Sequence, residues 1–112
     1  MNRDTFLAEI KEIELKRYDL LIGKSHDYAT DDALSNFKRM NILCKTLDID
    51  VRRSAGDCAR FLQVLKLDRK CNLLSKGVEP KNESIKDTVM DEHNYIDLAY
   101  GCDIERGICY DK

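Results

Sequence analysis

Two cations interrupt an apolar stripe in the segment 54–76. Lys66 and Arg69 fall on one side of a helix at this spacing, and Leu62 and Leu73 continue the same line at its two ends. Cations in such a place either extend along the helix surface or face an anion, such as a carboxylate or a phosphate. Lys66 and Arg69 are therefore candidates for phosphate binding, and a structural ion pair is the alternative.

A row of acidic and amide side chains follows in the segment 84–104. Asp87, Asp91 and Asn94 are spaced by four and three residues, so they share one helix face, and Asp97 lies about a sixth of a turn from Asn94. Carboxylates in a row repel one another unless solvent, cationic side chains or a metal ion faces them. Oxygen ligands of this kind suit Mg²⁺. We expect Asp87, Asp91 and Asp97 to bind metal only if the protein is Mg²⁺-dependent.

A third cluster of polar and aromatic residues lies between positions 24 and 37. It contains Lys24, Asp27, Tyr28 and Asn36. A tyrosine in a polar segment can stack on a base, and an aspartate can accept a hydrogen bond from a sugar or a base, or cap a turn. The segment 24–31 is polar and predicts a loop, and the alternative is that Asp27 and Tyr28 only serve the structure of that loop.

Four helices must position these clusters. Apolar residues at helical spacing predict helices over 4–23, 33–47, 54–76 and from Asn82 or Ser84 to about 104. Ser54 is a predicted N-cap and Gly77 a predicted stop. No alternating run predicts a strand. The chain therefore reads as one all-α domain, 1–104, folded as a small antiparallel four-helix bundle with a tail at 105–112.

Composition narrows the classes further. The chain has 112 residues, 43% hydrophobic and 36% charged, with a net charge of -2, which disfavours nucleic acid as the partner. No apolar run is long enough for a membrane span. Five cysteines, an odd number, with no leader-like start predict reduced thiols, mostly in the core, in a cytoplasmic protein. A core this thin also predicts a homo-oligomer.

The clusters together resemble a known family. The segments Lys24-Ser-His-Asp27-Tyr28, Leu34-Ser-Asn36-Phe37, Val64-Leu-Lys66-Leu-Asp-Arg69 and Asp87-Thr-Val-Met-Asp91-Glu-His-Asn94-Tyr-Ile-Asp97 resemble the nucleotide modification associated domain family of phages and bacteria. The resemblance covers roughly residues 15–100. It implies an all-α fold, a link to nucleotide metabolism and, for a phage-type protein in a host cytoplasm, a role in immune evasion.

A partial resemblance extends to the all-α nucleoside-triphosphate pyrophosphohydrolases of MazG and dUTPase type. Those enzymes hold Mg²⁺ with Glu-x-x-Glu on one helix and Glu-x-x-Asp on another. Here Asp91-x-x-Asn94-x-x-Asp97 is a degraded form of the second motif, and Glu9-x-x-Glu12 lies before the matching region. This departure favours nucleotide binding over catalysis.

Three functions follow as expectations. The first is a nucleotide-binding protein that captures a nucleotide signal, with Lys24, Asp27, Tyr28, Asn36, Lys66, Arg69 and Asn94 as ligand-binding residues. The second is a Mg²⁺-dependent nucleoside-triphosphate pyrophosphohydrolase. The third is a structural or adaptor bundle, in which Lys66 and Arg69 pair with Asp91 and Asp97. No Gly-rich phosphate loop, Gly-x-Ser-x-Gly or His-Glu-x-x-His motif is present to support other hydrolases.

Overall fold

Four helices and no strand make up the protein in a computed structural model that describes residues 1–112. The helices are α1 (Arg3–Tyr28), α2 (Ser35–Leu47), α3 (Ala55–Lys76) and α4 (Ile85–Glu105). The predicted all-α class and the number of helices are confirmed. No helix is long and apolar enough to cross a membrane.

The helix ends follow the capping residues, with two corrections. Ser54 and Ser84 accept hydrogen bonds from Asp57 N and Asp87 N, and Gly77 ends α3 in the left-handed conformation. In contrast, the loop predicted at 24–31 is wrong over 24–28, where α1 continues to Tyr28. The predicted start of α2 at residue 33 is also wrong, because residues 33 and 34 form a turn before Ser35.

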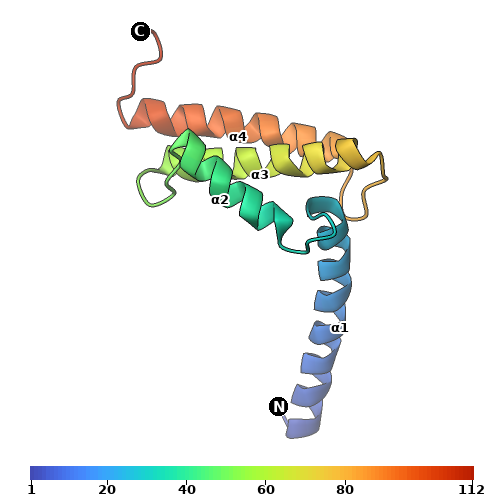
Figure 1. Ribbon diagram of the computed structural model, residues 1–112. Coiled ribbons are helices and arrows are strands. Elements are labelled where there is room, and N and C mark those ends of the chain that lie inside the picture. Colours follow the sequence, from blue (N-terminus) through green and yellow to red (C-terminus); the bar gives the residue numbers. More distant parts are fainter.

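Helix α3 lies at the centre of the molecule, as its apolar sequence predicted. It packs along most of its length against α4, antiparallel to it, and α2 and the last turns of α1 also contact α3 (Figure 1). The short connection 77–84 makes α3 and α4 a helical hairpin. The C-terminal end of α1 is held by side chains of α3, because the amide of Asn72 donates to the carbonyl oxygens of Asp27 and Ala29.

The buried part of the molecule is small and unusually polar. Only 15 of 112 residues are buried, and buried polar side chains outnumber buried apolar ones. Met40, Val64 and Leu73 are the largest apolar members, with alanines around them. None of the five cysteines is buried, so the expectation that they fill the core is wrong. Both polar contacts and apolar packing therefore hold the helices together.

The first 22 residues form a projecting arm. Helix α1 leaves the other helices at its C-terminal turns and extends away from them (Figure 1). Every residue from Met1 to Ile22 is exposed. The radius of gyration is 18.0 Å, whereas a compact domain of this length has about 13 Å. The single chain is thus far from a closed globule.

Candidate functional site

Arg69 and Asp27 form a buried ion pair between α3 and α1. Both side chains are completely buried, and Arg69 also donates to Thr88 Oγ1 and to the carbonyl oxygen of Glu83. Burial alone would raise the pKa of Asp27, but hydrogen bonds from the Lys81 amide and other donors, Arg69 included, lower it to about 2. Both oxygens of Asp27 are therefore occupied by the protein itself.

Lys66 extends this arrangement toward α4. Its ammonium lies 3.0 Å from Glu83 Oε1 and 3.2 Å from Asp91 Oδ2. Partial burial would lower the pKa of Lys66, yet the two carboxylates raise it above its ordinary value. We call Asp27, Lys66, Arg69, Glu83 and Asp91 the ion-pair cluster. The predicted pairing of Lys66 with Asp91 is confirmed, whereas the pairing of Arg69 with Asp97 is wrong, because Arg69 faces Asp27.

The other predicted site residues of α4 do not come together to form a binding site. Asp87, Asn94 and Asp97 are exposed and have no side-chain partner within the protein. Asp91 is turned toward Lys66 instead. No group of three or more His, Cys, Asp or Glu side chains is placed so that it could hold a metal ion. The structure thus does not assemble Asp87, Asp91 and Asp97 as metal ligands, because the row follows the helix and only Asp91 faces α3.

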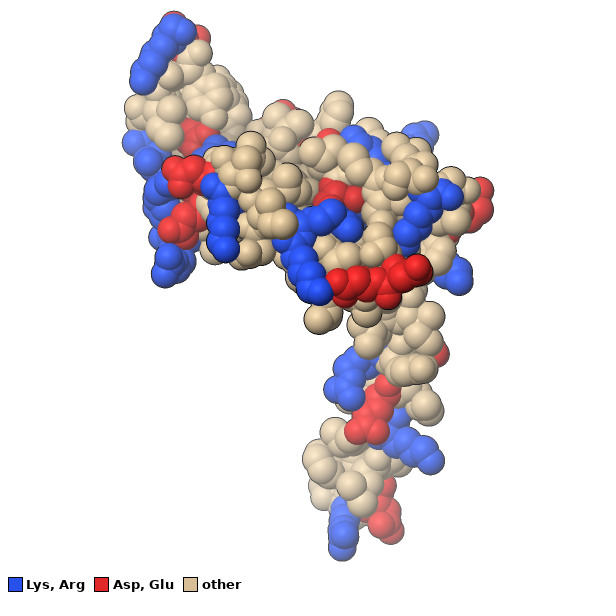
Figure 2. Space-filling model, viewed as in Figure 1, with Lys and Arg blue, Asp and Glu red and all other residues tan.

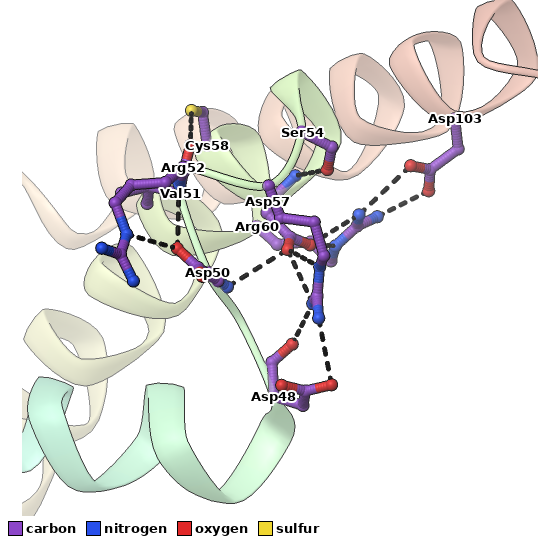
Figure 3. A network of polar contacts seen from close by, with 10 residues as sticks. Asp48, Asp50, Val51, Arg52, Ser54, Asp57, Cys58, Arg60 and Asp103 are labelled. Carbon is purple, nitrogen blue, oxygen red and sulfur yellow. Dashed lines mark hydrogen bonds and ion pairs between the residues drawn. The ribbon is translucent and has the colours of Figure 1, made fainter.

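A second charged network joins the N-terminal end of α3 to α4 (Figure 3). The sequence did not predict this network. Arg60 donates to Asp57 on its own helix, at 2.8 Å, and to Asp103 on α4, at 2.5 Å. Asp57 also accepts from the Asp50 amide and from Arg53, both in the connection before α3. Gly56 permits this approach, since a Cβ there would lie 2.3 Å from Asp103 Oδ1. All of these groups are mutually satisfied, so the network is structural.

A cleft of about 510 Å³ lies beside the ion-pair cluster, between the end of α1 and the start of α2. Its volume falls in the range of small-molecule sites. Its apolar walls come from three helices and the turn between α1 and α2, namely Leu21, Tyr28, Ala33, Leu34, Phe37 and Leu65. Its polar residues are Lys24, Ser25 and Asn36. Lys24, Tyr28 and Asn36, three of the predicted ligand-binding residues, therefore share one cavity.

Asn36 is the most informative residue of the cleft. As a whole residue Asn36 is only 6% exposed, and its amide has no hydrogen-bond partner within the protein, although its polar atoms keep some access to solvent, since Arg69 Nε is the only fully buried side-chain polar atom without a partner. Amides of residues this little exposed are normally paired within the protein. Asn72, which is as buried, follows that rule with two carbonyl partners. The free donors and acceptor of Asn36 are thus available to a molecule in the cleft.

Two aromatic rings complete the walls. Phe37 is 65% exposed, although its place on the apolar side of α2 is typical of a core residue. Tyr28 is held from behind, because the guanidinium of Arg69 lies 5.6 Å from the centre of its ring and Arg39 donates to its carbonyl oxygen. The ion-pair cluster therefore supports one wall of the cleft without lining it.

The predicted ligand-binding residues divide into three groups. Lys24, Tyr28 and Asn36 line the cleft, Asp27, Lys66 and Arg69 lie in the ion-pair cluster, and Asn94 lies apart on the exposed face of α4. Sequence reasoning did not count Phe37 or Ser25 as site residues, and it missed Glu83 as the common partner of Lys66 and Arg69. Phe37 stands beside Asn36 in the third cluster and in the motifs of the resemblance, but its apolar spacing on α2 indicates a core residue.

The chain matches no protein-family model, no curated protein and no solved structure. The resemblance described from the sequence motifs therefore stays a prediction.

Proposed function

We propose that the protein binds a nucleotide in the cleft and does not hydrolyse it. The observation that carries the proposal is the amide of Asn36, which has no partner within the protein and lines the cleft together with the aromatic residues Tyr28 and Phe37. A planar base fits between apolar walls with aromatic rings, and an amide can pair with the donor and acceptor atoms at the edge of a base. The base would stack on Tyr28 or Phe37 and be read by Asn36.

The charge at the cleft suits a ligand with little phosphate. Lys24 is exposed at the rim and has no acidic partner in the protein, so it is free to contact one phosphate. The other cations near the cleft are neutralised, since Lys66 faces two carboxylates and Arg69 faces Asp27. A nucleoside monophosphate or a related mononucleotide is therefore the ligand class that we propose, rather than a triphosphate.

The lining also favours binding over catalysis. It contains no Asp, Glu, His or Cys, the residue types that most often act as general bases at neutral pH or bind metal ions. Binding without turnover is the behaviour of a protein that sequesters a nucleotide, and capture of a nucleotide signal is the role that we propose. The pyrophosphohydrolase function gains no specific observation from the structure, and the adaptor function gains only the Lys66–Asp91 pair, which does not account for the cleft.

Calorimetric titration with nucleosides, nucleoside mono-, di- and triphosphates and inorganic phosphate tests the proposal. We expect saturable binding of at least one mononucleotide, recovered chemically intact afterwards. Phe37→Ala should weaken that binding about tenfold, because base stacking contributes about 1–3 kcal/mol. Ile42→Ala is the matched control, since Ile42 lies on the same helix and is 62% exposed but lies outside the cleft.

Two outcomes would contradict the proposal. One is the absence of binding by every compound in the series. The other is equal loss of affinity in Phe37→Ala and Ile42→Ala, which would place the ligand elsewhere. Conversion of the nucleotide during the titration would show an enzyme and remove the claim of binding without turnover.

A further inference from the structure

We infer that the projecting arm of α1 pairs with the same arm of a second copy of this chain, antiparallel and centred on Ile13. The inference is independent of the proposed nucleotide binding. It rests on the surface that the single chain leaves exposed and on the pattern of apolar and charged residues along the arm.

The exposed area is the first observation. The chain has an accessible surface of 8266 Å², whereas a folded monomer of 13.0 kDa has about 6,300 Å². The excess of about 1,900 Å² is more than twice the roughly 800 Å² that each partner contributes to a standard interface. A pair of chains that buried this excess would have an interface of the size found in obligate homodimers, about 2,000–5,000 Å².

The apolar spacing on the arm is the second observation. Phe6, Ile10, Ile13 and Leu20 are all exposed, from 38% to 54%. Together with Arg17 they follow the alternating spacing of four and three residues that brings side chains onto the seam of a helix pair. A seam of this kind on a helix with no partner in its own chain is typical of helix association between chains.

The charges on the arm favour a second copy of the chain as the partner and an antiparallel orientation of the two helices. Arg17 is the one charged residue within the seam between Phe6 and Leu20, and a charge there needs an opposite charge across the interface. Glu9 lies four residues before Ile13 and Arg17 four residues after it. In an antiparallel pair centred on Ile13, Glu9 of each chain therefore lies at the level of the partner's Arg17, and Phe6 at the level of the partner's Leu20.

The same residues make a parallel pair unfavourable. It would place the two Arg17 side chains against each other, and it would bring both folded bodies to the same end of the arms. The antiparallel pair separates the bodies, because each arm projects away from its own α2–α4 body (Figure 1). Charges of both signs are interspersed with uncharged surface along the arm (Figure 2), as a self-complementary interface requires.

The pairing would also reach the cleft. Around Ile13 as the centre, the first turn of the partner's arm lies at the level of Gly23 and Lys24. Leu21 and Lys24 line the cleft on the same helix. The second copy therefore covers the seam of α1 up to the rim of the cleft.

Sedimentation equilibrium over a wide range of protein concentration tests the inference. We expect a mass twice the 13.0 kDa of the chain. Ile13→Glu should raise the dimer dissociation constant by at least about 100-fold, because it buries a charge at the centre of the seam. Leu74→Glu is the control, since Leu74 is 61% exposed on α3, and it should leave the mass unchanged. A wild type that stays at the mass of one chain, or an Ile13→Glu variant that still dimerises, would overturn the inference.

Charge reversal tests the direction of the pair. Glu9→Arg and Arg17→Glu should each weaken the dimer about tenfold, and the double variant should restore it, since the two charges exchange places across the interface. A double variant weaker than both single variants would overturn the antiparallel pairing. Both residues are exposed on the arm, so the fold of the single chain does not depend on them.

Discussion

The ion-pair cluster and the cleft lie side by side, but they differ in whether their polar side chains have partners within the protein. In the cluster, Asp27, Lys66 and Arg69 each have partners within the protein. In the cleft, Lys24 and Asn36 have none. Both groups look alike in the sequence as charged or amide residues in helices. Arg69 Nε also lacks a partner, but it is enclosed by the protein. The difference teaches that a polar group with no partner in the protein and with access to a cleft, rather than the most charged group, marks where a ligand can bind.

Removal of Arg69 should have the largest effect, and that effect should be on stability. Arg69→Met leaves the completely buried Asp27 without its cation, so we expect the free energy of unfolding to fall by about 3–5 kcal/mol. Urea unfolding measures it. Arg52→Met is the control, because Arg52 is exposed and its pair with Asp50 lies at the surface, and it should change stability by less than about 1 kcal/mol. Equal effects of the two substitutions would contradict the structural role of the cluster.

The second largest effect should come from acid, which lowers the stability that the ion-pair cluster contributes. The pKa of Asp27 is about 2 in the folded protein and 3.8 is its ordinary value. Because the folded pKa is the lower one, the stabilisation by Asp27 is fully present above about pH 4 and is lost as the pH falls toward 2. We expect about 2 kcal/mol of the unfolding free energy to disappear in this window.

Urea unfolding from about pH 5 to pH 2 checks the acid effect, with Asp27→Asn as the comparison. Asp57 and Asp103 also have lowered pKa values, since Arg60 bonds to both of them, so the variant keeps part of the acid dependence. The difference between the two curves reports Asp27. Identical acid dependence in the wild type and the variant would contradict the account.

Two buried asparagines offer the sharpest separation of the two regions. Asn72→Leu breaks hydrogen bonds to the carbonyl oxygens of Asp27 and Ala29, so we expect a loss of about 1–3 kcal/mol in stability. Asn36→Leu breaks no bond within the protein, so its stability should stay the same or rise, while nucleotide affinity falls about tenfold. Urea unfolding and calorimetric titration of both variants check the contrast. If Asn36→Leu lost as much stability as Asn72→Leu, the proposed difference between the two regions would be contradicted.

Lys24 should show the smallest effect. Lys24→Ala removes one exposed phosphate contact, and we expect affinity to fall about threefold at low salt and less at high salt, with stability unchanged. Lys11→Ala is the matched control, because Lys11 is exposed on the same helix far from the cleft. Equal effects of the two substitutions at every salt concentration would remove Lys24 from the site.

Much of the fold could be predicted from the sequence, because helix periodicity and caps are local. Ser54, Ser84 and Gly77 are used as the sequence predicts. The last turns of α1 could not be predicted, since their residues are polar and become helical where Asp27 meets the Lys81 and Asn82 amides, more than 50 positions later. Local patterns do not show which distant segment will satisfy a polar side chain.

The candidate site could be predicted only in part for the same reason. Lys24, Tyr28 and Asn36 were found because they are close together in the sequence. The sequence favours a phosphate ligand at Arg69, because the partner Asp27 lies 42 positions away and leaves no local signal. Phe37 has the spacing of a core residue, yet no other helix covers it, so the apolar pattern alone could not distinguish a core from a wall of the cleft.

Nuclear magnetic resonance with a bound nucleotide tests the central claim most directly. We would titrate the mononucleotide found by calorimetry into ¹⁵N-labelled protein and follow backbone and side-chain amide signals. The account predicts saturable shifts of the Asn36 side-chain amide and of the Ser25 and Leu65 backbone amides, which surround the cleft. Shifts concentrated on the exposed face of α4 around Asn94, with the Asn36 signals unmoved, would contradict it.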